Sequence, residues 1–477
     1  MTTIACPLRE AAQISRQEGA IFGPDRDLLY SEWDELATRV AANLKQLGLG
    51  PGDRIALFLP QDWRYPVILM GVIRAGAVAC PLSTRQPRDA VIDQLRWINC
   101  RAVVAYSREA QTSEDLPCAQ LHPDTLLAEP VSRVSPEAIR YALDQPATIL
   151  FTSGSTGDPK AVQHSIGNHY YSARGSNNNL RIRSHDRWLM QVPIYHVSGL
   201  SIVFRCMLSG AGIAMPGREE SLVEAINGYG ATHLSLVPTQ LRRLLADPEA
   251  EQRMKKIKAI LLGGSALDEQ ALKQAFHRGW PVYPTYGLTE MASQVTTVPV
   301  LTPPERRYYA GSPLAYRELQ IAPDGEILVR GSCLFQGYVQ GDAVDPAVDA
   351  EGWFHTGDLG TLDEEQRLKV NGRKDDMFIS GGENIHPAVI ERAMMNLGGI
   401  DRVLVVPVTD KEFGQRPVAF VLGSQRTAEA WPALLRPVLA GFQIPVAFLA
   451  WPEGESWQSD KPNRENFALL AEAMLAR

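Results

Sequence analysis

The six cysteines of this chain are scattered, and no two of them form a C-x-x-C pair. Neither a disulfide framework nor a cysteine zinc site is therefore indicated, and a reducing cytoplasm is the expected compartment. The sequence has no run of basic residues and a net charge of −7, so we expect no nucleic-acid partner. The N-terminus lacks the basic start and apolar stretch of a signal peptide. No apolar run is long enough to span a bilayer, so no membrane partner is expected.

What is present is the composition of an ordinary globular protein. The 477 residues are 45% hydrophobic and 21% charged, and this length supports a large core and more than one domain. Short apolar runs alternate with amphipathic helical patterns, which is typical of α/β proteins whose strands are buried on both faces. The clearest predicted strands are 55–59, 102–106, 147–151, 233–237 and 259–262.

The segment 32–47 predicts the best-marked helix. Ser31 and Asp34 have the spacing of a capping box, with Asp in the place of the usual Glu, and Gly48 is expected to end the helix. One apolar stripe follows helical spacing along it: Trp33, Leu36, Val40 and Leu44.

A change of pattern near residue 374 predicts a domain boundary. The charged segment 372–376 separates a β-rich part from a small α+β unit, so we expect domains of residues 1–374 and 375–477. The elements expected around the boundary are strands at 326–330, 368–370, 403–406 and 418–422 and helices at 387–396 and 427–439.

The segment Thr152-Ser-Gly-Ser-Thr-Gly-Asp-Pro-Lys160 is the most informative motif. Its glycines let the backbone approach an anion, and its N–H groups, hydroxyls and ammonium can surround phosphate oxygens. It is not a Walker A loop, because Pro159 stands between the last glycine and the lysine, and Ala161 follows. A flexible turn accounts for the same residues, so the loop alone leaves both interpretations open.

An ordered series of further motifs follows this loop. In order they are Pro193-Ile-Tyr-His-Val-Ser-Gly199, Leu262-Gly-Gly-Ser-Ala266, Tyr286-Gly-Leu-Thr-Glu290, His355-Thr-Gly-Asp358, Gly372-Arg-Lys-Asp-Asp376, Ser380-Gly-Gly-Glu-Asn-Ile385 and Ser459-Asp-Lys461. The series resembles that of the acyl-adenylate-forming enzymes, which include acyl-CoA synthetases, firefly luciferase and the adenylation domains of peptide synthetases. The resemblance covers nearly the whole chain. It implies an α/β fold, with a large multi-subdomain N-terminal domain of two α/β layered sheets plus a β-rich part, and a small mobile α+β C-terminal domain.

The resemblance also implies a two-step reaction. A carboxylate attacks the α-phosphate of ATP to give an acyl-adenylate and pyrophosphate, and the thiol of CoA then displaces AMP. The first step brings two anions together, so cations and oriented N–H groups are needed. The residues implied to bind ATP or CoA are Thr152, Ser153, Gly154, Ser155, Thr156, Gly157, Lys160, Gly263, Gly264, Ser265, Ala266, Tyr286, Gly287, Thr289, Asp358, Arg373, Lys461, Gly381 and Gly382.

Individual roles follow from the same resemblance. Tyr286 is implied to stack on adenine, Asp358 to accept from both ribose hydroxyls, and Arg373 to bond ribose or phosphate. Thr289 would contact the α-phosphate, and Glu290 would bind Mg²⁺, which favours carboxylate, phosphate and water oxygens. Core packing for the tyrosine, and surface exposure for the Asp and Arg, are the alternatives.

The C-terminal motifs are implied to act in turn. Lys461 would bridge the attacking carboxylate and the α-phosphate, and would contribute more to the chemical step than Lys160. Asp460 stands where the family commonly has glycine, and it could pair with the lysine instead. Asp375 matches the hinge about which the small domain rotates, and Gly381 and Gly382 would then leave room for pantetheine. A simple turn before a helix beginning at Pro387 accounts for those glycines equally well.

Within the family, the stretches 167–173, 186–189, 196–201 and 286–295 resemble the o-succinylbenzoate–CoA ligases of menaquinone biosynthesis. Their acid is an aromatic dicarboxylic acid. An apolar helix after His196, with Ser198 at its N-cap, carries Ser198, Ser201 and Arg205 on one face. A buried arginine needs an anion, and this branch has a basic residue at the same place, so Arg205 is assigned to the second carboxylate. An internal acid or the helix dipole is the alternative partner.

The remaining candidates for the acid pocket are Ser293, Gln294 and His196, which is also a candidate catalytic or gating residue. A ligase for another aryl or medium-chain acid, a module that charges a carrier protein, and a non-catalytic nucleotide-binding protein remain open. The sequence also leaves the oligomeric state open, a homo-oligomer included.

Overall fold

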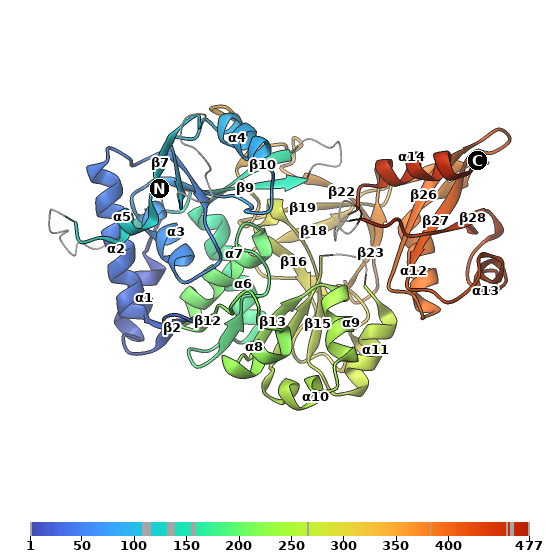
Figure 1. Ribbon diagram of the computed structural model, residues 1–477, viewed down its shortest axis with the longest axis horizontal. Coiled ribbons are helices and arrows are strands. Elements are labelled where there is room, and N and C mark those ends of the chain that lie inside the picture. Colours follow the sequence, from blue (N-terminus) through green and yellow to red (C-terminus); the bar gives the residue numbers. More distant parts are fainter. Residues whose placement is uncertain are drawn as a thin grey trace.

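The computed structural model describes residues 2–106, 116–130, 139–153, 159–264, 267–381, 383–454, 457 and 462–475. Within them the strands form two large sheets, a four-stranded sheet, a five-stranded sheet and a two-stranded ribbon of β1 (Thr3–Ala5) with β8 (Arg140–Ala142). The two large sheets and their helices occupy one side of Figure 1, and the C-terminal sheet stands at the opposite end beside the four-stranded sheet.

The first large sheet has eight strands, parallel from β9 to β7 and antiparallel from β9 to β21. In spatial order they are β21 (Ala343–Asp345), β20 (Gly337–Gln340), β10 (Pro159–Ser165), β9 (Pro146–Ser153), β5 (Val78–Pro81), β4 (Arg54–Phe58), β6 (Ala102–Ala105) and β7 (Ala119–Leu121).

The second large sheet has nine strands, and its centre is parallel. In spatial order they are β17 (Ser312–Pro313), β16 (Ser293–Thr297), β15 (Val282–Leu288), β14 (Ala259–Leu262), β13 (His233–Leu236), β11 (Arg187–Leu189), β12 (Gly212–Ala214), β2 (Gly19–Phe22) and β3 (Leu28–Leu29).

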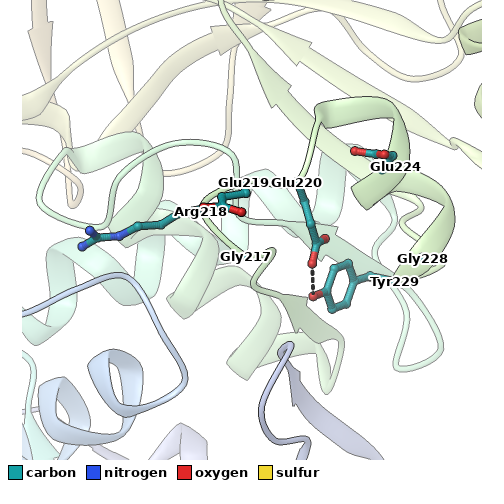
Figure 2. A pocket seen from close by; sticks show the side chains of 7 residues that line it. All are labelled: Gly217, Arg218, Glu219, Glu220, Glu224, Gly228 and Tyr229. Atoms are coloured by element: carbon teal, nitrogen blue, oxygen red, sulfur yellow. Dashed lines mark hydrogen bonds between the residues drawn. The ribbon is translucent and has the colours of Figure 1, made fainter.

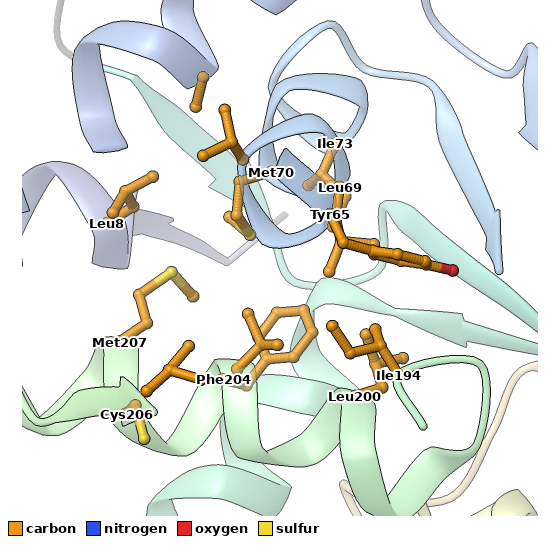
Figure 3. Packing of buried hydrophobic residues seen from close by; sticks show 14 of the residues in the cluster. Leu8, Tyr65, Leu69, Met70, Ile73, Ile194, Leu200, Phe204, Cys206 and Met207 are labelled. Carbon is orange, nitrogen blue, oxygen red and sulfur yellow. The ribbon is translucent and has the colours of Figure 1, made fainter. Parts of the chain in front are cut away.

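Helices cover both faces of each large sheet, which explains the continuous apolar runs of the strands. In β4, Ile55 and Leu57 join the core between the sheets, whereas Ala56 packs in the cluster that contains α4. In β14, Ile260 packs with α8 to α11 and Leu261 packs in the core between the sheets. In that core, side chains of α3 and α7 point toward one another (Figure 3).

The helices of these layers are α1 (Pro7–Ile14), α2 (Tyr30–Gln46), α3 (Arg64–Arg74), α4 (Arg88–Trp97), α5 (Pro123–Leu127), α6 (Ile166–Leu180), α7 (Val197–Ser209), α8 (Leu222–Gly228), α9 (Pro238–Ala246), α10 (Ala250–Arg253) and α11 (Glu269–His277). No helix formed by the described residues has the length and apolarity that a membrane crossing requires.

The rest of the chain forms two smaller sheets. The four-stranded sheet is antiparallel and runs β18 (Glu318–Ile321), β19 (Glu326–Arg330), β22 (Phe354–Leu362), β23 (Leu368–Arg373). The C-terminal sheet contains β25 (Glu383–Ile385), β24 (Phe378–Ser380), β27 (Gly414–Leu422), β26 (Arg402–Asp410) and β28 (Ala447–Ala450). Its helices are α12 (Pro387–Asn396), α13 (Trp431–Leu435) and α14 (Arg464–Leu475).

The α/β fold class and the predicted strands are confirmed, and α12 begins at Pro387 as predicted. Two details were wrong. Helix α2 begins at Tyr30, and the Glu32 carboxylate accepts the backbone N–H of Leu29 at 2.8 Å, so Ser31 lies inside the helix. The predicted helix 427–439 is a 3₁₀ turn followed by the five-residue α13. Pro432 would lie inside the predicted helix, where proline is disfavoured, but it is tolerated in the first turn of α13.

Candidate functional site

A single cleft of about 3470 Å³ collects residues from three of the sheets and from the C-terminal unit. Among its lining residues are Lys160 of β10, Gly263 after β14, Asp358 of β22 and Arg464 of α14. A smaller, open hollow is lined by the segment 217–220 and by Glu224, Gly228 and Tyr229 (Figure 2). It adjoins the cleft, with which it shares Gly217, Arg218 and Glu220. That hollow contains no predicted site residue, so the cleft is the candidate site.

The two ends of the predicted phosphate loop lie opposite each other. Thr152 of β9 and Lys160 of β10 are paired across the antiparallel ladder, and both line the cleft. Ser153 is the last residue of β9. Gly154, Ser155, Thr156 and Gly157 lie outside the described residues. The two strands thus bring both ends of the predicted loop to the cleft, as a phosphate-binding loop requires.

Lys160 and Glu290 meet at the ring of Tyr338, a residue that sequence reasoning missed. The Lys160 Nζ atom lies 5.0 Å from the ring centroid. The Tyr338 hydroxyl donates a hydrogen bond of 2.7 Å to Glu290 Oε1. Burial and the Glu290 carboxylate raise the pKa of Tyr338, so the hydroxyl keeps its proton at neutral pH.

Thr289 and Glu290 form a 3₁₀ turn directly after β15, and a buried histidine holds that turn. The Nε2 atom of His164 lies 2.7 Å from the Thr289 carbonyl oxygen. Since a carbonyl can only accept, Nε2 carries the proton. Burial lowers the pKa of His164 to about 4, so the ring is neutral at physiological pH. A lone histidine within a strand of mixed polarity carries no pattern that would have predicted this contact.

Tyr286, Asp358 and Arg373 form one hydrogen-bonded group. The Tyr286 hydroxyl donates to Asp358 Oδ2 at 2.7 Å, and Arg373 donates to Asp358 Oδ1 at 3.2 Å. Arg373 also contacts Asp375 Oδ2 at 3.2 Å. Burial raises the pKa of Asp358 above its ordinary value even though Tyr286 and Arg373 act to lower it. The three predicted nucleotide residues are thus brought together, and Arg373 links them to the predicted hinge residue.

Gly263, Gly264 and Gly287, which were predicted to bind ATP or CoA, line the cleft. Gly263 follows β14, and a Cβ atom there would lie 2.8 Å from the Thr285 side chain. Gly287 sits at a bulge of β15, where a Cβ atom would clash with the Ser293 carbonyl oxygen. Ser265 and Ala266 lie outside the described residues.

The acid-binding candidates lie around α7. His196, Ser198, Arg205, Ser293 and Gln294 line the cleft. Helix α7 begins at Val197 with His196 as its N-cap residue, so the predicted cap at Ser198 was wrong. The Ser201 hydroxyl donates to the Ser198 carbonyl at 2.8 Å, and Ser201 is not among the residues that line the cleft.

Arg205 is 1% exposed, and among the described residues it has no carboxylate partner. Its guanidinium donates to the Ser293 hydroxyl at 3.0 Å and lies 5.1 Å from the Trp188 ring centroid, while its buried Nε atom finds no acceptor in the described structure. Burial, with the nearby charge of Arg317, lowers the pKa of Arg205 to about 9. The side chain remains a cation at the wall of the cleft, and no acid in the described part of the chain neutralises it.

The backbone that supports Ser293 is unusual. Ala292 and Ser293 have φ values of 51° and 115°, which non-glycine residues rarely adopt. This turn aims the Ser293 hydroxyl at Arg205. Arg317, also buried, donates to the carbonyls of Gln294 and Ala315 and to Ser172. It therefore anchors the turn, whereas Arg205 keeps donors for a ligand.

The C-terminal unit faces the cleft with the segment that precedes α14. Pro462, Asn463 and Arg464 line the cleft. Arg464 holds this segment in place through Asp376 at 2.9 Å and Glu391 at 2.7 Å. Lys461 and Asp460 lie outside the described residues.

The predicted pantetheine loop lies elsewhere. Gly381 is exposed, with φ 57°, and is not among the residues that line the cleft. Gly382 lies outside the described residues. The orientation of the small unit therefore brings the segment beside Lys461, rather than the loop at Gly381, to the site.

A magnesium ion can be tested against the donors present. No group of three or more His, Cys, Asp or Glu side chains among the described residues could hold a metal ion. Mg²⁺ does not need such a cage, because it keeps several waters and binds through one or two carboxylates plus substrate phosphates. Glu290, a carboxylate on the cleft wall beside the phosphate hairpin, fits this donor set.

The chain is similar in sequence to known proteins of one family. The family described as AMP-binding enzyme matches residues 8–339. The 2-succinylbenzoate–CoA ligase of Bacillus velezensis is 34% identical over 454 residues, which cover 92% of this chain and 93% of the relative.

Solved structures are similar over almost the full length. The o-succinylbenzoate CoA synthetase of Bacillus subtilis in complex with its acyl-adenylate intermediate superposes with a TM-score of 0.87 at 29% identity, covering 98% of each chain. The same enzyme in complex with ATP and a magnesium ion gives a TM-score of 0.86 at 30% identity, covering 97% of this chain and 99% of the other.

Proposed function

Because the chain belongs to the AMP-binding enzyme family, we propose that it is an ATP-dependent ligase that joins o-succinylbenzoate to coenzyme A in menaquinone biosynthesis. The observation that carries the choice of acid is Arg205, a buried cation at the wall of the cleft that has no carboxylate partner among the described residues. A second carboxylate on the acid neutralises it. We place the enzyme in the cytoplasm, where ATP and CoA are available.

The reaction has two displacements. The succinyl carboxylate oxygen attacks the α-phosphorus of ATP, and pyrophosphate leaves with the electrons of the broken P–O bond. The sulfur of CoA, as its thiolate, then attacks the acyl carbon, and AMP leaves. The site must therefore bind a triphosphate and two carboxylates at once, and cations that are not neutralised by protein acids suit that task.

ATP would lie along the hairpin and the Tyr286–Asp358 group. Lys160 and the turn after Thr152 would hold the β- and γ-phosphates, and Thr289 would contact the α-phosphate. Asp358 would accept from the ribose hydroxyls, since each of its oxygens keeps a lone pair beside the bond to Tyr286 or Arg373. Glu290 would hold Mg²⁺, which supplies charge neutralisation at the phosphates when bound.

The acid would enter beside α7. Its aromatic carboxylate would accept from Arg205, with Ser293 as a neighbouring hydroxyl, and Gln294 and Ser198 would border the ring. His196, exposed at the N-terminus of α7 and in ring contact with Tyr195, would gate this end of the cleft. The geometry favours Arg205 over Ser201, whose hydroxyl is used within the helix.

The small unit of residues 375–477 would move between the two steps. In the present orientation the segment next to Lys461 faces the cleft, as adenylation requires. Rotation about Asp375 would then exchange it for the loop at Gly381 and Gly382. Lys461→Ala should abolish acyl-adenylate formation and spare thioester formation from supplied acyl-adenylate, and loss of both steps would refute this role.

A thioester assay with ATP and Mg²⁺ tests the proposal. The acids to compare are o-succinylbenzoate, benzoate, 4-phenylbutyrate and octanoate. A strong preference for o-succinylbenzoate is expected, since only this acid offers a second carboxylate to Arg205. Comparable turnover of the monocarboxylic acids would instead identify a ligase for another aryl or medium-chain acid.

A further inference from the structure

Tyr338 contacts the two charged residues that are assigned above to ATP and its metal. Its hydroxyl is 2.7 Å from Glu290 Oε1, and its ring centroid is 5.0 Å from Lys160 Nζ. Among the described residues neither Lys160 nor Glu290 forms an ion pair. Within the described part of the chain, the tyrosine is therefore the common neighbour of a cation and an anion that have no ion-pair partner.

Strand pairing puts the ring in this place. Tyr338 lies on β20 directly opposite Val162 of β10, and Lys160 stands two residues before Val162 on the same strand. Residues at this diagonal position share one face of a sheet, within reach of long and aromatic side chains. The contact between ring and ammonium thus follows from the register of the two strands.

The segment that contains Tyr338 also fixes the backbone of Glu290. The N–H of Phe335 donates to the Glu290 carbonyl at 2.7 Å, and the rings of Phe335 and Tyr338 are in edge contact with centroids 4.9 Å apart. Glu290 is consequently held at its carbonyl and at its carboxylate by residues 335–338. One carboxylate oxygen is directed by a neutral donor, which leaves its negative charge available to a metal ion.

A direct bond between Lys160 and Glu290 would be unproductive, because each charge would then satisfy the other and neither would face a ligand. An aromatic ring attracts an ammonium without neutralising it, and a phenol hydroxyl orients a carboxylate without neutralising it. Tyr338 provides both contacts in one side chain.

We propose that Tyr338 is a positioning residue that holds Lys160 and Glu290 apart and correctly directed for magnesium-bound ATP. The inference rests on the proposed function, since it takes from there the roles of Lys160 and Glu290. The Tyr338 hydroxyl orients the Glu290 carboxylate that would bind the metal, and the Tyr338 ring positions the Lys160 ammonium that would bind phosphate.

Calorimetry can separate the contact of the hydroxyl with Glu290 from the contact of the ring with Lys160. ATP binding is measured first in excess EDTA and then at increasing Mg²⁺ concentrations. Tyr338→Phe keeps the ring and removes the hydroxyl. The affinity for ATP in EDTA should stay within twofold of the wild type, whereas the apparent affinity for Mg²⁺ at fixed ATP should fall about tenfold. Tyr338→Leu removes both contacts and should in addition weaken ATP binding in EDTA by about fivefold.

Tyr171→Phe is the matched control, because Tyr171 packs against the same hydrophobic cluster and does not line the cleft. It should bind like the wild type in both conditions. Wild-type Mg²⁺ dependence in Tyr338→Phe would overturn the inference, as would an equal loss in the presence and absence of Mg²⁺.

Glu290→Gln distinguishes failure of the inference from failure of the proposed metal site. If Glu290→Gln weakens Mg²⁺ binding and Tyr338→Phe does not, only the positioning role is refuted. If Glu290→Gln leaves Mg²⁺ binding unchanged, the metal assignment and the inference both fail. In the Glu290→Gln background, Tyr338→Phe should have no further effect on Mg²⁺ affinity.

Discussion

The guanidinium of Arg205 donates to the Ser293 hydroxyl at 3.0 Å, although the two residues come from α7 and from the first position of β16. Two opposing requirements meet in this contact. A buried cation is costly unless an anion accompanies it, yet a cation already paired with a protein acid could not bind a substrate carboxylate. The Ser293 hydroxyl accepts one hydrogen bond from the Arg205 guanidinium, and being neutral it leaves the positive charge available to a substrate carboxylate.

Replacing Arg205 should therefore weaken binding of o-succinylbenzoate without lowering the stability of the fold. Arg205→Met should raise the KM for o-succinylbenzoate about 100-fold, because loss of one partner of a buried charged pair costs about 2–5 kcal/mol, and should leave the KM for ATP within twofold. The melting temperature of the ligand-free protein should not fall, since the variant removes an unneutralised buried charge. A lower melting temperature with equal loss toward both substrates would indicate a structural role instead.

Asp358 should determine how the enzyme recognises ribose. Its carboxylate is held by Tyr286 and Arg373 in a position to accept hydroxyl groups. We expect the wild type to prefer ATP to 2′,3′-dideoxyATP by about 10- to 100-fold, as hydrogen bonds to charged groups contribute about 1.5–3 kcal/mol. Asp358→Asn should lose most of this preference in kcat/KM. Tyr286→Phe, which retains the ring, should keep it, and an unchanged preference in Asp358→Asn would contradict the assignment.

Arg242 should favour the adenylation half-reaction over thioester formation. From α9 it contacts Asp268, and it donates to the Asp401 carbonyl at 2.6 Å and the Ile400 carbonyl at 3.3 Å. These bonds hold the C-terminal unit in the orientation that brings residues 462–464 to the cleft.

Arg242→Ala should accordingly slow ATP–pyrophosphate exchange about tenfold, which corresponds to about 1.4 kcal/mol. Thioester formation from supplied acyl-adenylate should not slow. The exposed neighbour Arg243 provides the control, because Arg243→Ala should leave both rates unchanged. Equal slowing of both half-reactions would show that Arg242 stabilises the fold without favouring one orientation.

Buried histidines should make stability fall in mild acid. Burial lowers the pKa of His164 and of His233 to about 4, and lowers that of His169 well below its ordinary value. In the unfolded chain a histidine binds its proton near pH 6.5. The unfolded state therefore takes up protons first, and stability present above pH 6.5 is lost as the pH falls from 6.5 toward 4.

His164→Gln tests this linkage, because glutamine retains an N–H donor for the Thr289 carbonyl and does not titrate. Between pH 7.5 and 5.5, urea unfolding should show a loss of stability that is smaller in the variant by about 1.4 kcal/mol. His277→Gln, at an exposed position, should show the wild-type loss. A wild-type loss in His164→Gln would mean that another group dominates the acid response.

Much of the candidate site could be predicted from the sequence, because its residues occupy short motifs with fixed local geometry. Lys160, Glu290, Asp358 and Arg373 were predicted, and all line one cleft. Two of the predictions that were wrong concern helix starts, where a neighbouring residue could take the capping position. At the start of α2, Glu32 accepts the N–H of Leu29 in place of the predicted bond at Ser31, and at α7 the helix begins one residue before Ser198.

The sequence by itself determined the apolar runs that become strands buried on both faces, and the order of the motifs that end at the cleft. Periodicity and turn chemistry are local properties, so a single chain displays them. Only the tertiary structure decided that Tyr338 stands between Lys160 and Glu290, that His164 holds Thr289, and that Arg205 meets Ser293 rather than an acid. These contacts depend on strand register and on the packing of helices against sheets, which join residues distant in the chain and leave no periodic trace in it.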